Sequence, residues 1–351
     1  MWIRRLAALL AAIALVGGAI VVRDRIDRSP AAASGPTSTS ATGGGGSATT
    51  QPTTFTLVCI TELEKACQAA ASEVKGPPAI AVRVEEAGTT RDALTTAADP
   101  GSIVSAWVTL SPWAKLTDLA RGRAPSPLLP AFDAALPLAQ SPIAMAVKAD
   151  RYDALDKTCS PTITWTCIGN NAGKPWTDLN GNVSWGTLNP AHADPAVNAT
   201  GLVALAAIVE SKIGNSTFTG ADLDKDDDFS AWINRFEQAI RASAFNPDSS
   251  PLQQLLRQPD HSVIATTHAE IVSLSGTNRA VVREVTPVQT ATAEAIVAPV
   301  LGVVLPPAIV TALSNALLDI GWTAPTSGAT NAPDATTMEA IQAKWSTSWR
   351  R

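Results

Sequence analysis

The segments FTLVCI (55–60) and ELEKACQAAASEV (62–74) decide the fold, because a short apolar strand pattern is followed at once by an amphipathic helix pattern. AIAVRVE (79–85) is a second strand pattern, and a helical pattern near 90–98 and a third strand pattern, IVSAWVTL (103–110), come after it. Strands that alternate with helices pair in parallel through right-handed crossovers. The sequence therefore predicts a β-α-β-α-β unit at the start of an α/β domain.

The alternation continues toward the C-terminus. Further strand patterns lie at 138–148, 183–188 and 262–267, and the segment 280–300 is rich in Val, Ala and Thr and predicts extended structure. Further helical patterns lie at 113–121, 200–213, 229–244, 307–320 and 335–349.

The composition is that of a globular protein with about two domains. Of the 351 residues, 46% are hydrophobic, which is enough for a sizeable core. The formal net charge is −5, and the basic residues are scattered along the chain. A nucleic-acid surface needs clustered Lys and Arg, so we expect no nucleic-acid partner.

Residues 1–28 predict a membrane anchor or a signal segment. Two arginines precede the apolar run 6–22, whose seventeen residues lie at the lower edge of the length of a membrane span. Five charged residues separate this run from a small-residue cleavage site at 31–33, which favours an uncleaved anchor over a cleaved signal peptide. Residues 29–54 are rich in Ala, Ser, Thr and Gly and predict a flexible linker. We expect a single-pass protein with its domain outside the cytoplasmic membrane, or a secreted one if the segment is cleaved.

Four segments resemble the type II periplasmic solute-binding family in their order: LAQSPIAMAVKADRY (138–152), WGTLNPAHADPAVNATG (185–201), HSVIATTHAEIV (261–272) and GWTAP (321–325). They resemble, in turn, the crossing into the second lobe, a strand and ligand loop that lead into a helix, the returning strand with a polar tip, and a stretch after a late helix of the first lobe. The resemblance implies an α/β, two-lobed fold. Each lobe is expected to be a mostly parallel sheet flanked by helices, and a two-strand hinge is expected to join them.

The resemblance also implies boundaries. Lobe one is expected at 55–141 plus 285–325, lobe two at 142–284, and a C-terminal helical tail at 326–351. The tail is similar to the connector that leads into a von Willebrand A-type domain in some actinobacterial relatives. An interaction or sensing role therefore stays open beside transport.

In such a fold the ligand lies between the lobes, at the carboxyl ends of strands and at helix N-termini. The family's contact positions, carried over to this sequence, are Thr61, Glu62, Thr109, Ser111, Ser141, Thr187, Asn189, Thr200, Gly201, Thr267 and Glu270.

Most of these side chains are hydroxyls, which suit a neutral or weakly anionic polar solute. Thr200 and Gly201 are expected to present free backbone N–H groups to an anion at a helix start, unless Thr200 is merely the N-cap of that helix. Glu62 and Glu270 argue differently: if both point into the cleft, a cationic or hydroxyl-rich ligand is favoured.

The four cysteines form two pairs with a spacing of eight: Cys59 and Cys67, and Cys159 and Cys167. Four unrelated buried thiols are one interpretation. The even count, the paired spacing and the export segment favour two disulfides, which persist outside a reducing cytosol. We predict Cys59–Cys67 and Cys159–Cys167, because each loop is short and each pair lies within one expected lobe.

The sequence carries none of the common enzyme motifs, and we expect no catalysis, cofactor or metal. The three histidines, His192, His261 and His268, share no metal-ligand spacing. The run DLDKDDD (222–228) lacks the Gly and the final Glu of a calcium loop and predicts a solvated acidic loop before a helix. Trp113 and Trp185 are open to two interpretations, stacking on a sugar ring or packing in the core, and we favour the core.

The expected function is capture of a small polar solute by closure of the two lobes, for delivery to a membrane permease or for sensing. A cell-surface interaction protein with a vestigial cleft is the alternative. A hydrolase built on the same fold is a third possibility, since a fold does not fix a function.

Overall fold

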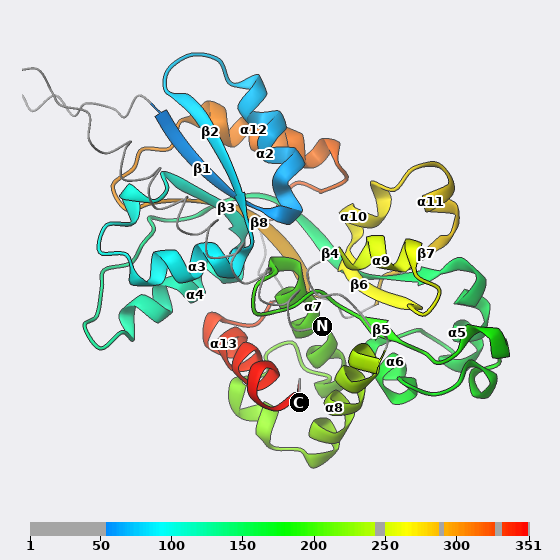
Figure 1. The fold of residues 1–351 in the computed structure, drawn as a ribbon. Helices are drawn as coiled ribbons and strands as arrows, with labels where there is room; N and C mark the ends of the chain where they lie inside the picture. Colours follow the sequence, from blue (N-terminus) through cyan, green and yellow to red (C-terminus); the bar gives the residue numbers. More distant parts are fainter. Residues whose placement is uncertain (1–53, 243–249, 288–290, 327–331, 350–351) are drawn as a thin grey trace, which may run out of the picture. The chain divides into compact units, whose positions relative to one another are not determined.

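The computed structural model describes residues 54–242, 250–287, 291–326 and 332–349 (Figure 1). The predicted anchor (1–28) and nearly all of the predicted linker (29–54) lie outside these residues. Within the described part of the chain, no helix has both the length and the apolar character needed to cross a membrane.

The strands of the described residues form a sheet of eight members, in the order β2-β1-β3-β8-β4-β6-β5, with β7 paired to β4. The strands are β1 (Thr54–Ile60), β2 (Ala79–Glu85), β3 (Ala106–Leu110), β4 (Leu136–Lys148), β5 (Pro190–Ala191), β6 (Val263–Thr267), β7 (Val282–Val285) and β8 (Thr292–Pro299).

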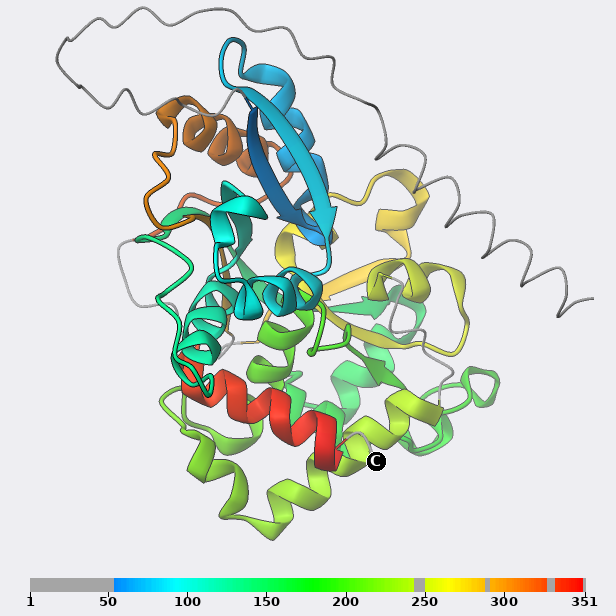
Figure 2. The same ribbon diagram turned by 60° about the vertical axis from the view of Figure 1, so that its left-hand side comes forward.

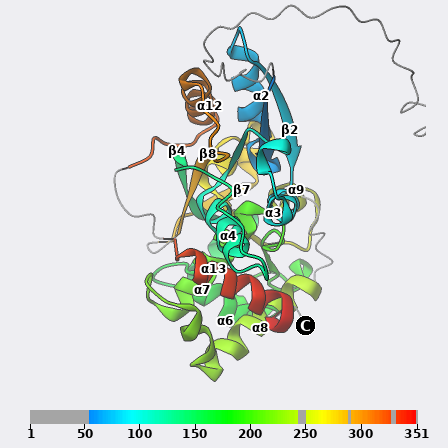
Figure 3. The same cartoon turned by 90° about the vertical axis from the view of Figure 1, so that its left-hand side faces the viewer.

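The helices connect and cover these strands. They are α2 (Glu64–Glu73), α3 (Ala87–Thr96), α4 (Ser111–Gly122), α5 (Tyr152–Thr158), α6 (Trp165–Asn171), α7 (Ala199–Ile213), α8 (Asp227–Ala242), α9 (Pro251–Arg257), α10 (His268–Val272), α11 (Gly276–Ala280), α12 (Pro307–Asp319) and α13 (Ala335–Lys344). In lobe one, α2 packs against α12 and α3 packs against α4 (Figures 1 and 3).

Strand β4 belongs to both lobes. Its first half, up to Pro142, pairs with β8, and its second half, from Ile143, pairs with β6 and β7. Lobe one is therefore built on β1, β2, β3, β8 and the start of β4, and lobe two on the end of β4 with β5, β6 and β7. The two-lobed α/β class is confirmed, with β4 and β8 as neighbouring strands at the crossing.

The pairing is mixed where a mostly parallel one was expected. Strand β1 pairs in parallel with β2 and β3, and β5 with β6, whereas β8 and β4 pair antiparallel with each of their neighbours. The cause is the crossing itself: one strand leaves lobe one and the other returns, so the two run in opposite directions.

The opening β-α-β-α-β unit follows from its apolar pattern. Every residue of β3 is buried, and so is every residue of β1 from Leu57 to Ile60. Such strands, covered by helices on both faces, read as continuous apolar runs. The core residues Trp107 and Trp113 are completely buried, so Trp113 packs in the core and has no surface to offer a sugar ring.

The predicted strand at 183–188 is wrong. Residues Val183–Trp185 form a 3-10 turn that is capped by the side chain of Asn182, and Gly186 follows with a φ of 69°. A strand cannot pass through a residue in this left-handed region. The strand instead begins at Pro190 and is only two residues long.

The extended structure predicted for 280–300 is confirmed by two separate strands, β7 and β8, and among its described residues only Ala280 belongs to a helix, as the last residue of α11. The C-terminal pattern at 335–349 is helical as predicted, as α13 followed by the π-helical turn η7 (Trp345–Trp349).

Both predicted disulfides are present. Cys59 at the end of β1 is bonded to Cys67 in α2 with a Cα–Cα distance of 6.6 Å, and Cys159 to Cys167 in α6 with 5.8 Å. Each bond closes a short loop inside one lobe.

Removal of the first disulfide should lower the stability of lobe one. A disulfide that closes a loop of about nine residues lowers the conformational entropy of the unfolded chain, which stabilises the folded state by about 2–3 kcal/mol. We expect Cys59→Ala/Cys67→Ala to lower the guanidinium midpoint accordingly, measured by circular dichroism. Cys159→Ala/Cys167→Ala provides the matched comparison in lobe two. An unchanged midpoint in both pairs would contradict a stabilising role.

Candidate ligand-binding site

A cavity of about 460 Å³ lies between the two lobes. Lobe one lines it with the 3-10 turn η1 (Thr61–Leu63), the first turn of α2, Glu86 after β2, and Trp322 after α12. Lobe two lines it with the loop before α7, with Ser250 and Pro251, and with the connection from β6 to α10. The carboxyl ends of β1, β2 and β6 face this space, as expected for a ligand site in an α/β fold.

The structure brings five of the predicted site residues together in the lining of this cavity. They are Thr61, Glu62, Thr200, Thr267 and Glu270.

The side chain of Glu62 reaches across the cavity to the first turn of α7. Its Oε1 atom accepts a hydrogen bond of 2.9 Å from the backbone N–H of Thr200 in α7. The next amide, of Gly201, donates to Asn198 Oδ1 at 2.8 Å, so Asn198 is the N-cap of α7. A carboxylate is favourable at a helix N-terminus. Both interpretations of Thr200 are therefore wrong: it is not the N-cap, and its amide donates to the protein's own carboxylate.

Glu270 lies on the lobe-two side of the cavity. Ser250 Oγ donates to its Oε1 atom at 3.0 Å, and Thr266 Oγ1 donates to its Oε2 atom. Burial raises the pKa of Glu270 above its ordinary value, and the charge of Glu62 adds to that rise, against the opposing effect of the two hydroxyl donors and Lys65.

The lining carries four carboxylates and one ammonium group, from Glu62, Glu64, Glu86, Glu270 and Lys65. Thr61 Oγ1 lies 3.1 Å from Glu62 Oε2 and 3.2 Å from Glu86 Oε1, so these two carboxylates converge on one hydroxyl. Carboxylates accept hydrogen bonds and repel anions. The cavity is therefore suited to cations and to hydroxyl donors, and poorly suited to oxyanions.

Three predicted residues near the hinge lie outside the cavity lining. Thr109 is fully buried within β3, where it pairs with Ile296, and α7 packs over β3, β4 and β8. Ser111 is the first residue of α4. Ser141 is buried, and its Oγ atom accepts the backbone N–H of Ala269 at 3.0 Å, which attaches α10 to the hinge strand.

The remaining three also lie outside the cavity lining, and two of them, Thr187 and Asn189, were misplaced by the wrong strand at 183–188. Thr187 and Asn189 precede β5, so they lie at its amino end, away from the cavity, and Thr187 Oγ1 donates to Asn189 Oδ1 at 3.0 Å. Gly201 lies inside α7, where an added Cβ would be 2.5 Å from the carbonyl oxygen of Ala193. This glycine serves close packing.

Several residues of the lining were not predicted from the sequence, among them Glu86, Lys65, Asn198, Ser250 and Trp322. Glu86 had a signal: it directly follows β2, whose carboxyl end lies beside that of β1. The rule that selected Thr61 and Glu62 would have selected it too.

The three histidines, Trp185 and the acidic run 222–228 are not part of the cavity lining. No three His, Cys, Asp or Glu side chains of the described residues gather as metal ligands. Trp185 packs edge-on against Trp176 at 5.5 Å, outside the cavity lining. Within the acidic run 222–228, a hydrogen bond from Lys225 and others from Thr219 lower the pKa of Asp222 to about 2.

No family model matches the sequence, and no curated protein does. Solved structures are similar. The periplasmic binding protein AfuA from Actinobacillus pleuropneumoniae, with fructose-6-phosphate bound, gives a TM-score of 0.53 at 13% identity, over 83% of this chain and 97% of that one. A periplasmic thiamin-binding protein gives 0.53 at 9% identity, over 85% and 96%. An ABC transporter structure from Clostridium perfringens gives 0.51 at 12% identity, over 85% and 99%. The chain therefore has the two-lobed fold of the periplasmic solute-binding proteins.

Proposed function

We propose that this protein is an extracytoplasmic solute-binding protein that captures a small cationic or hydroxyl-rich solute between its two lobes. The observation that carries the proposal is the cavity of about 460 Å³, which both lobes line and in which four carboxylates outnumber one ammonium group. Its volume falls within the usual range of about 300–1,000 Å³ for small-molecule sites.

The charge of the cavity selects the solute class. The sequence had suggested a neutral or weakly anionic ligand bound by hydroxyls and helix amides. Glu62 occupies the amide of Thr200, and Glu270 lies opposite with its own two hydroxyl donors. An anion would have to displace one carboxylate and approach the other, whereas an ammonium or hydroxyl group finds acceptors on both lobes.

A location outside the cytoplasm is supported by the two disulfides, which persist in oxidising compartments. We also propose a membrane anchor at 1–28, delivery of the solute to a permease, and lobe boundaries at 141/142 and 284/285. The role is one of binding, without catalysis or a cofactor.

One observation favours a second candidate, a surface interaction protein with a vestigial cleft. The bond between Glu62 and Thr200 already joins the lobes across the cavity. In that case the lobes would remain together and the cavity would take no solute.

A solute panel separates the two candidates. We expect an amine or polyol, drawn from putrescine, spermidine, choline and mannitol, to raise the melting temperature, while sulfate and phosphate leave it unchanged. A solute at 100 times its Kd stabilises by about 2.7 kcal/mol. The measurement is differential scanning fluorimetry on the wild type. Stabilisation by sulfate or phosphate alone would sink the proposed solute class, and no response to any probe would favour the vestigial cleft.

Glu270→Gln should weaken binding of a cation about tenfold or more, because hydrogen bonds to charged groups contribute about 1.5–3 kcal/mol. Since the pKa of Glu270 is raised, the wild-type affinity for a cation should increase as pH rises through that pKa, when the carboxyl ionises. The substitution should remove this part of the pH dependence. Calorimetry at several pH values measures both effects, and the exposed Glu73→Gln on α2 is the matched control. Equal affinities in the two variants would mean that Glu270 does not contact the solute.

Thr200→Ala should weaken binding of the same solute roughly threefold to tenfold, the effect of one lost hydrogen bond to a neutral group. The backbone amide of Thr200 keeps its bond to Glu62 in this variant, so the helix start is retained. The exposed Thr336→Ala on α13 is the control for loss of a threonine hydroxyl elsewhere. If both variants bind like the wild type by calorimetry, the hydroxyl of Thr200 takes no part.

A further inference from the structure

The C-terminal helix α13 lies between elements of both lobes. It packs against α4 of lobe one and against α7 and the 3-10 turn η6 (Gly220–Asp224) of lobe two. In all three views it runs between α4 and α8 (Figures 1, 2 and 3). Met338 and Ile341 on this helix are completely buried. The packing is therefore that of a core helix shared by two lobes.

Polar contacts attach one side of α13 to lobe one. Arg123 at the end of α4 forms an ion pair with Glu339. Arg91 of α3 donates from Nη1 to Gln342 Oε1 at 2.9 Å. Gln342 itself is 7% exposed, so water competes little for this bond.

Other contacts attach the same helix to lobe two. Gln342 Nε2 donates to the carbonyl oxygen of Pro195 at 2.8 Å, in the loop that leads into α7. Lys344 pairs with Asp224 of η6. An added Cβ on Gly220 would lie 2.8 Å from Cβ of Ala340, so η6 and α13 are in close contact. The single amide of Gln342 thus bridges both lobes, with its oxygen facing lobe one and its nitrogen facing lobe two.

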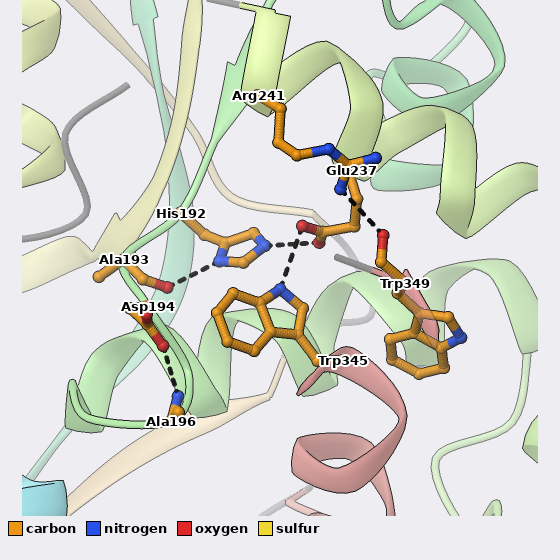
Figure 4. Close-up of polar contacts among 8 residues, drawn as sticks. All are labelled: His192, Ala193, Asp194, Ala196, Glu237, Arg241, Trp345 and Trp349. Carbon is orange, nitrogen blue, oxygen red and sulfur yellow. Dashed lines mark hydrogen bonds and ion pairs between the residues drawn. The ribbon is translucent and has the colours of Figure 1, made fainter. Parts of the chain in front are cut away.

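The end of the tail is anchored on a buried ion pair (Figure 4). Trp345 Nε1 donates to Glu237 Oε2 at 3.1 Å, and Glu237 Oε1 lies 2.8 Å from His192 Nε2. The other ring nitrogen, Nδ1, lies 2.7 Å from the carbonyl oxygen of Ala193, which only accepts, so Nδ1 donates there. His192 and Glu237 therefore share a proton across their contact. Arg241 also donates to the carbonyl oxygen of Trp349 at 3.1 Å.

The His192–Glu237 pair is 3% exposed at both residues. Burial acts to lower the pKa of His192, but Glu237, the carbonyl of Ala193 and the charge of Asp194 together outweigh it, and the pKa lies above its ordinary value. A buried carboxylate that loses a hydrogen-bond donor bears a large desolvation cost. Withdrawal of Trp345 would impose that cost on Glu237, so the lobe-two end of the tail is firmly held.

The loop 193–198, which follows His192, also lines part of the cavity. Residues 193–198 connect the His192 site to α7, and Ala193 and Asn198 line the cavity. The carbonyl oxygen of Val197 in this loop accepts the N–H of Gly88 in lobe one at 2.9 Å, and an added Cβ on Gly88 would lie 2.7 Å from the carbonyl oxygen of Ala196. The tail, this loop and lobe one therefore meet at one place.

We propose that α13 and η7 form a strap that holds the two lobes together and sets the width of the cavity, so that opening of the cleft requires release of the strap from one lobe. Rotation of the lobes about β4 and β8 separates α3 and α4 from the 193–198 loop and from η6. A helix bound to both sides resists that rotation, with or without a solute. The buried His192–Glu237 pair holds Trp345, and with it the tail, on lobe two. The strap therefore detaches from lobe one when the cleft opens.

Hydrogen exchange tests the strap without any solute, so its outcome is independent of the proposed solute. The amides of Gly88 and Thr200 each donate across the lobes, to Val197 and to Glu62, and their exchange reports opening. Gln342→Met keeps the side-chain volume but removes both bridging bonds. We expect exchange of these two amides to accelerate about tenfold, the effect of roughly one to two lost hydrogen bonds, while the β1 amides of Val58 and Cys59 are unaffected.

Two further variants secure the result. Arg91→Met removes only the lobe-one bond and should accelerate the same two amides to a smaller extent. Thr336→Ala, an exposed substitution on the same helix, should leave all amides at the wild-type rate. If Gln342→Met leaves Gly88 and Thr200 unchanged, or accelerates the β1 amides equally, the tail adds only general stability and the strap is refuted.

Discussion

The sheet passes from one lobe to the other through the region where β4 and β8 pair, and the register of that pairing ends at Pro142 and Thr292. Two adjacent antiparallel strands can bend and twist together, but they fix neither the angle between the lobes nor the space between them. Within the described residues, those are determined by noncovalent contacts away from the hinge. These contacts are the hydrogen bond from Thr200 to Glu62, the hydrogen bond from Gly88 to Val197, and the packing of the C-terminal helix against both lobes. The size of the cavity thus depends more on these contacts between the lobes than on the topology of the sheet.

The parts of the fold that could be predicted are those in which apolar residues recur at a regular spacing along the sequence. The strands and helices from Phe55 to Leu110, helix α7 and the C-terminal helix all follow from apolar spacing. The strand at 183–188 failed because its apolar residues were given more weight than Asn182 and Gly186, which encode a turn. That one error moved Thr187 and Asn189 from the cavity to the opposite end of β5.

The candidate site was predictable only in part, for a related reason. The resemblance to the solute-binding family places ligand contacts at the carboxyl ends of strands, and this found Thr61, Glu62, Thr267 and Glu270. The family's contact positions do not reveal which of these groups already forms a hydrogen bond to another part of the protein. The bond from Thr200 to Glu62 joins residues 138 positions apart, and no local pattern encodes it. Once the partner of Glu62 was known, the inferred solute changed from a neutral or weakly anionic one to a cationic or hydroxyl-rich one.

The two disulfides have a consequence for how the chain matures. Each joins cysteines only eight positions apart, and the first pair precedes the second by about ninety residues of sequence. A chain that emerges from its N-terminus exposes Cys59 and Cys67 together, long before Cys159 appears. Oxidation in order of emergence then yields the native pairing directly, with no need for an isomerase to correct a cross-link between the lobes. The arrangement is that of a protein whose covalent bonds can be completed while most of the chain is still unfolded.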